Sequence, residues 1–113
     1  MEDNNAEKIF SIFDNIKPHL NEILIKGIES ISRENYEEIV HLKENLEYMH
    51  LNTINKKLTS FIAKIDLLLQ GKATKDLKQD LAVSTLHIIT IIRMFERIMT
   101  LEIVKKDLQK NKE

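Results

Sequence analysis

Apolar residues recur every three or four positions along most of this chain, which is the periodicity of amphipathic helices. The pattern forms three long segments, residues 5–30, 33–70 and 75–108, followed by a fraying tail over residues 109–113. Caps for the connection near residues 30–33 are offered by Ser30, Ser32 and Asn35. Gly71 suits the position just after the end of the second segment, and Thr74 can cap the third. The sequence therefore predicts one all-α domain, residues 1–113, built as a long antiparallel helical hairpin plus an N-terminal helix.

The first segment contains Pro18, which cannot donate the backbone hydrogen bond back to residue 14. Two outcomes are compatible with this residue. The helix either bends and continues, or it breaks so that Pro18 starts a second piece. We expect a kinked but continuous helix.

The third segment carries apolar residues on two opposite faces. At about 100° per residue, one face must point toward a core; it consists of Leu77, Leu81, Ile88, Ile92, Phe95 and Met99. The opposite face carries Val83, Leu86, Met94 and Leu101 among His87, Thr90, Arg93 and Arg97. A helix that is apolar nearly all round is normally covered on more than one side. The pattern thus predicts a partner for the second face.

Helix lengths predict where a partner is needed. The second segment would measure about 55 Å and the first about 39 Å, so one end of the hairpin would lack a third helix. We expect two such ends to pair in a homodimer that completes a four-helix bundle with coiled-coil-like packing. The predicted protein interface is Phe61, Ile65, Leu68, Leu81, Val83, Leu86, Met94 and Leu101. The alternative is a monomer that closes into a four-helix bundle through a sharp break at Pro18 or within residues 33–70.

The amino-acid composition further restricts the possible fold classes and kinds of site. Two glycines and one proline leave too little turn-forming material for a many-stranded fold, and the absence of cysteine excludes disulfides and thiolate metal sites. The first residues are acidic and polar, unlike a secretory signal, and the most apolar window, residues 81–92, is too short to span a bilayer. We therefore expect a soluble, cytoplasmic protein without a membrane span.

Charge is distributed unevenly along the chain. Residues 1–50 contain 11 acidic and 5 basic side chains, whereas residues 51–113 contain 7 acidic and 12 basic ones. Acidic and basic faces can meet inside the fold or across a dimer, or the basic half can bind an acidic partner such as nucleic acid. The candidate nucleic-acid contacts are Lys72, Lys75, Lys78, Arg93 and Arg97. For Arg97, pairing with Glu47 in an antiparallel hairpin is the competing structural interpretation.

Two Glu-x-x-His patterns, Glu38–His41 and Glu47–His50, have the spacing found in carboxylate-bridged di-iron bundles. They are nine residues apart, which is about half a turn out of phase, so they point to opposite sides and cannot share a metal. His50 lies on the apolar stripe, where we expect a hydrogen-bonded core or interface histidine.

Motifs for catalysis are also lacking. The sequence has no glycine-rich phosphate loop and no cysteine nucleophile, and no Ser/His/Asp arrangement can be argued from it. We therefore expect no enzyme activity, no metal and no cofactor. The leading hypothesis is a helical protein–protein interaction, adaptor or assembly module acting as a homodimer. The alternative is a small helical nucleic-acid-binding accessory subunit or regulator.

Overall fold

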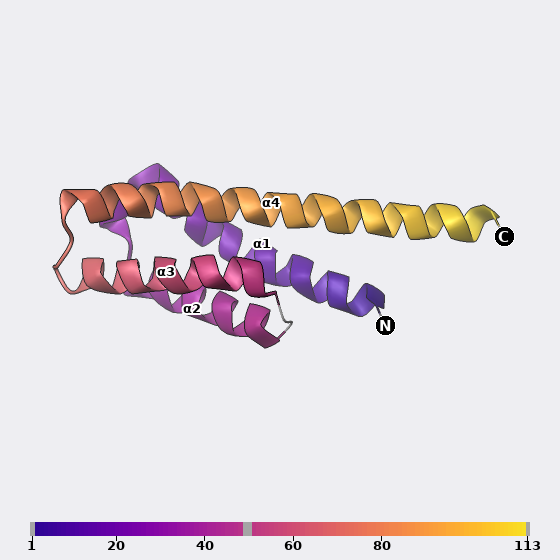
Figure 1. Cartoon of the computed structure of the whole chain (residues 1–113), viewed down its shortest axis with the longest axis horizontal. Helices are drawn as coiled ribbons and strands as arrows, with labels where there is room; N and C mark the ends of the chain where they lie inside the picture. The colour runs from indigo at the N-terminus through magenta and orange to yellow at the C-terminus, as the bar shows by residue number, and fades with distance from the viewer. Residues whose placement is uncertain (1, 49–50, 113) are drawn as a thin grey trace.

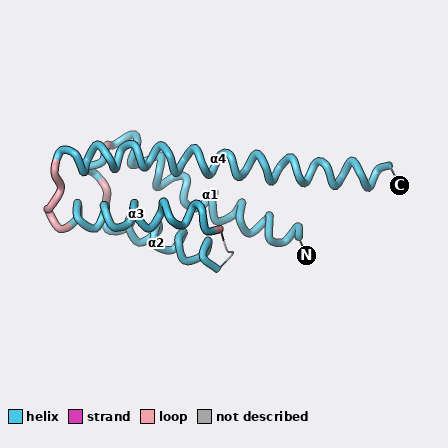
Figure 2. The backbone as a smooth tube through the Cα atoms, viewed as in Figure 1, coloured by secondary structure: helices cyan, strands magenta, loops and turns pink. Residues whose placement is uncertain are grey.

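The computed structural model describes residues 2–48 and 51–112, and this part of the chain is all-helical (Figure 1). It contains the helices α1 (Glu2–Lys26), α2 (Arg33–Tyr48), α3 (Asn52–Leu69) and α4 (Lys75–Lys112), with a short 3-10 turn, η1, at Ile28–Ser30. The chain reverses direction between consecutive helices (Figure 2). Helix α1 packs against α2 and α4, and α3 packs against the same two helices. Four helices of one chain therefore surround a common core.

The predicted single helix over residues 33–70 is wrong, because α2 ends at Tyr48 and α3 begins at Asn52. The buried residues explain this break. Those of α2 lie on one stripe and those of α3 on another, yet on an unbroken helix the two stripes would differ in direction by about 100°. Reversal of the chain lets both stripes face the same core. They consist of Asn35, Ile39, Leu42 and Leu46 in α2, and Ile54, Asn55, Leu58, Phe61 and Ile65 in α3.

This reversal also changes the predicted dimer interface. Phe61, Ile65 and Leu81 have no exposed surface within the single chain, and Leu68 is half-buried. They were assigned to an interface because the predicted hairpin lacked a covering helix. Since α1 and α2 supply that cover, these four side chains give no reason for dimerisation.

Helix α1 continues through Pro18, as expected, but it ends at Lys26 instead of residue 30. Gly27 follows with φ +95°, a left-handed conformation that favours glycine. Pro18 and Asp14 are both exposed, so water can reach the carbonyl group that lacks its helical donor.

The α3–α4 connection has the predicted caps. Gly71 has φ +77°, its N–H donates to the Leu68 carbonyl at 3.1 Å, and the Lys72 N–H donates to the Leu67 carbonyl at 3.0 Å. This pair of bonds is the Schellman motif. The Thr74 hydroxyl accepts the Leu77 N–H at 3.1 Å, which caps the start of α4.

Helix α4 is the longest helix in the described part of the chain, with 38 residues against 25 in α1, 16 in α2 and 18 in α3. Its last buried residue is Ile92. We call residues 93–112 the α4 extension, whose C-terminal part continues past the ends of the other helices (Figure 1). The molecule is accordingly elongated, with extents of 60 × 24 × 20 Å.

Candidate protein interface

The two faces of α4 have different surroundings. Leu81, Ile88 and Ile92 are at most 1% exposed and belong to the core. On the opposite face, four apolar side chains keep about half of their surface exposed, with values between 51% and 61%; they are Val83, Leu86, Met94 and Leu101. These four residues were predicted to contact a partner, and within the chain they are uncovered.

The exposed apolar face continues further than the sequence analysis indicated. Ile98, Val104 and Leu108 are 55%, 47% and 57% exposed. Successive steps of three or four residues along positions 94, 98, 101, 104 and 108 were the signal that could have identified them. We call the whole set the outer seam, which consists of Val83, Leu86, Met94, Ile98, Leu101, Val104 and Leu108.

Two threonine hydroxyl groups along the outer seam are already hydrogen-bonded within α4. The Thr90 hydroxyl donates to the Leu86 carbonyl at 2.8 Å, and the Thr100 hydroxyl donates to the Glu96 carbonyl at 2.7 Å. Such bonds to the preceding turn use the hydroxyl hydrogen within the helix. A partner that covers this face would therefore leave neither hydroxyl donor without an acceptor.

Arg93 and Arg97 are exposed along the seam, where they line a surface groove together with Glu96, Thr100 and Leu101. Within the described ranges, neither arginine forms an ion pair. The predicted partner of Arg97, Glu47, instead pairs with Lys43 at 3.2 Å. The physical reason is that α2 lies diagonally across the bundle from α4, whose neighbours are α1 and α3.

Two contacts connect α1 to the beginning of the extension. Lys17 Nζ donates to Glu96 Oε2 at 2.7 Å, and the Phe13 and Phe95 rings lie 6.4 Å apart at a tilt of 52°. The hydrogen bond to the Glu96 carboxylate and its negative charge raise the pKa of Lys17 above the ordinary 10.5. These contacts hold the first turn of the extension against the bundle.

The candidate nucleic-acid residues do not form one surface. Lys78 donates to Glu29 Oε1 at 2.7 Å, which lowers the pKa of Glu29, while Lys72 and Lys75 are exposed near the α3–α4 connection. Lys75 and Arg93 are about 27 Å apart along α4. Apolar Val83 and Leu86 lie on α4 between them. A single stretch of nucleic acid would thus cross an apolar surface between the two basic groups.

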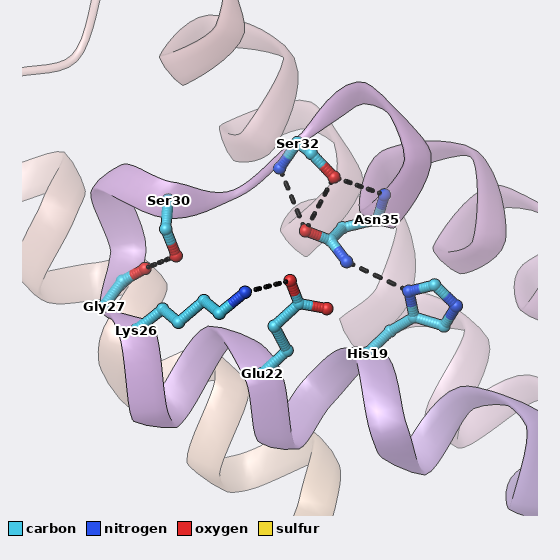
Figure 3. Close-up of polar contacts among 7 residues, drawn as sticks. All are labelled: His19, Glu22, Lys26, Gly27, Ser30, Ser32 and Asn35. Atoms are coloured by element: carbon cyan, nitrogen blue, oxygen red, sulfur yellow. Dashed lines mark hydrogen bonds and ion pairs between the residues drawn. The ribbon is translucent and has the colours of Figure 1, made fainter.

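A polar junction at the opposite end of the bundle connects α1 to the start of α2 (Figure 3). Asn35 is 2% exposed, and its Oδ1 accepts the backbone N–H and the hydroxyl of Ser32, both at 2.9 Å. Its own N–H donates to the Ser32 hydroxyl at 3.1 Å, which completes a reciprocal helix cap. Its Nδ2 donates to His19 Nδ1 at 3.0 Å. The Ser-x-x-Asn spacing predicted a cap, but the contact with His19 depends on helix packing.

The Glu-x-x-His patterns do not assemble a metal site in the described part of the chain. His41 is exposed, and its Nδ1 lies 3.7 Å from Glu44 Oε2. Across residues 2–48 and 51–112, no three histidine or carboxylate side chains are grouped to hold a metal ion. His50 lies outside the described residues, so its predicted core or interface position is untested.

Comparisons with protein-family models, curated proteins and solved structures found no match for this chain. None of the helices in the described ranges has the length and hydropathy needed to cross a lipid bilayer. The outer seam, together with Arg93 and Arg97, is therefore the basis for proposing a function.

Proposed function

We propose that this protein is a non-enzymatic helical protein–protein interaction module that uses the outer seam of α4 as its docking surface. One observation carries the proposal: seven apolar side chains, each about half exposed, follow one face of a single helix whose other face already supplies the core. Soluble monomers rarely leave an apolar surface of this extent uncovered.

The composition of the seam supports protein recognition. Methionine and arginine are enriched at protein interfaces, and the apolar centre of an interface is typically bordered by polar side chains. Met94 lies in the seam, Arg93 lies at its edge, and Arg97 lies on the seam between Met94 and Leu101. The seam also lies on one continuous helix, so binding would require little ordering of the backbone.

Site-specific photo-crosslinking in cells that produce the protein tests this proposal. A photoreactive residue is placed at Leu101, in the seam, or at Leu67, which is 41% exposed on α3 and serves as the control. We expect covalent protein adducts from position 101 and none from position 67. Absence of protein adducts at position 101 would exclude the outer seam as a docking surface.

Charge substitutions provide the matched variants. Met94→Glu placed in the photoreactive chain should abolish the adducts at position 101, because a carboxylate in an apolar contact is costly to desolvate. Leu67→Glu should leave those adducts unchanged. Helix content measured by circular dichroism should be the same for both variants, since both positions are exposed.

A further inference from the structure

We propose that the outer seam binds a second copy of the same chain, with the two α4 helices antiparallel and related by a two-fold axis near residues 99 and 100. This inference rests on the proposed function, because it names the occupant of the same docking surface.

The charges at one edge of the outer seam would be complementary in an antiparallel pair. Arg93 and Asp107 are both exposed, and they are 14 residues, or two heptads, apart. They therefore lie at the same edge of the seam, about 21 Å apart along the helix. Their midpoint is Thr100. If that point lies at the two-fold axis, Arg93 faces Asp107 of the second copy and the same pair forms again on the other side.

The apolar residues agree with this register. Seam positions that face each other in antiparallel helices have a constant sum, here about 198, so Met94 packs against Val104 of the second copy. Ile98, at one edge of the seam, then lies close to Ile98 of the second copy. Leu108 faces Thr90 of the second copy, whose hydroxyl group is hydrogen-bonded to a carbonyl of its own helix. One register thus places apolar residues and opposite charges together.

A parallel pair is less favourable. In register, it would place Arg97 against Arg97 of the second copy. Like charges in a desolvated contact repel, and each guanidinium would lose water without gaining an acceptor. The antiparallel pair instead places Arg97 opposite Leu101, where its long apolar stem can pack while the guanidinium remains in water.

The buried area reaches that of a stable dimer. In the antiparallel register, residues 86–112 of the two helices overlap, and six seam residues on each copy become covered. Each of these side chains is about half exposed. At on the order of 100 Å² apiece, the two copies would bury roughly 1,200 Å², the lower limit for specific interfaces. The seam lies opposite the core face, so each bundle stays clear of the contact, and each α4 extension lies along the partner's α4.

Charge reversal tests the proposal because it distinguishes a second copy from any other occupant. Arg93→Asp would place two aspartates together, and Asp107→Arg would place two arginines together. Each single variant should raise the dimer dissociation constant by roughly 10-fold or more. The double variant restores opposite charges and should return the constant to near that of the unsubstituted chain. Lys57→Asp, on the exposed surface of α3, is the control and should have no effect.

Mixing the two single variants sharpens the test. A heterodimer of Arg93→Asp with Asp107→Arg contains only opposite charges at both contacts, so it should form in preference to either homodimer. Light scattering coupled to size exclusion, over a wide concentration range at low salt, gives the masses. The expected dimer has twice the chain mass of 13.3 kDa.

Four outcomes are decisive. A concentration-independent monomer would overturn the second-copy inference. A dimer whose dissociation constant is unchanged by either charge reversal would overturn it as well. If the chain is monomeric but position 101 crosslinks to a different protein, the proposed function stands and only this inference fails. If position 101 forms no protein adduct at all, both fail.

Discussion

The two halves of α4 have similar apolar content but different surroundings. Residues 75–92 contribute buried side chains to the core, whereas residues 93–112 are joined to α1 by a ring contact at Phe95 and a hydrogen bond at Glu96. On the face that points toward the bundle, Leu81 and Ile88 of the first half are at most 1% exposed, but Ile103 of the second half is 36% exposed. Apolar content therefore does not decide burial. The number of helices that reach a given turn of α4 decides it.

This difference has a structural origin in the break between α2 and α3. Because the chain reverses there, α2 and α3 are each shorter than half of α4. The bundle closes around the first half of α4 and leaves the second half projecting. The same reversal that completes the core thus leaves the second half of α4 with fewer covering helices.

The largest expected effect contrasts the core with the seam. Phe61→Ala should lower the free energy of unfolding by about 3–5 kcal/mol, because Phe61 is fully buried and its removal leaves a cavity. Leu101→Ala should change it by less than about 0.5 kcal/mol, since the residue is exposed. Denaturant unfolding at concentrations low enough to prevent association measures both. A cost for Leu101→Ala similar to that of Phe61→Ala would show that the extension packs into the bundle.

A smaller, stabilising effect is expected at Asn55. This residue is 7% exposed, and its side-chain amide has no hydrogen-bond partner in the described part of the chain. Asn55→Leu should raise the free energy of unfolding by about 1–3 kcal/mol, because it removes buried polar atoms that make no bond. Asn35→Leu is the matched control and should be destabilising, since Asn35 is equally buried but hydrogen-bonded. Thermal and denaturant unfolding would detect the opposite signs.

The contact between α1 and the extension should contribute less. Glu96→Gln should lower the free energy of unfolding by about 1 kcal/mol, a value discounted because Lys17 is 39% exposed. Since the pKa of Lys17 is raised in the folded chain, this contribution is fully present below pH 10.5 and is lost as the pH rises through the raised value. Asp14→Asn, at an exposed position 3.5 Å from the same amine, is the control and should have little effect. Equal losses for both variants would contradict this assignment.

The smallest effect concerns the exposed pair at the other end of α4. Lys78 lowers the pKa of Glu29, so the pair stabilises the fold above the ordinary pKa of 4.5 and ceases to do so as the pH falls through the lowered value. Glu29→Gln should therefore make the melting temperature less sensitive to pH between about 5 and 3. Calorimetry at low salt measures this. High salt should reduce the difference because the pair is solvent-exposed; an unchanged pH profile at low salt would contradict the prediction.

Much of the local structure could be predicted from the sequence. The periodicity of Leu81, Ile88 and Ile92 correctly predicted the core face of α4, and Gly71 and Thr74 correctly predicted the α3–α4 caps. These features depend on residues within one or two helical turns of each other. The sequence by itself therefore determined the helical class, the caps and the two apolar faces of α4.

The path of the chain over residues 33–70 depended on tertiary structure. Leu46, Ile54 and Leu58 are spaced by multiples of four, so they resemble one continuous stripe although each step of four rotates by about 40°. No local interaction shows whether these residues lie on one long helix, with a stripe that turns around its axis, or on two helices separated by a reversal of the chain. The reversal lets α2 and α3 bury their apolar stripes in one core and leaves the second face of α4 uncovered. Burial is a property of distant segments that meet, which is why only the tertiary structure decided it.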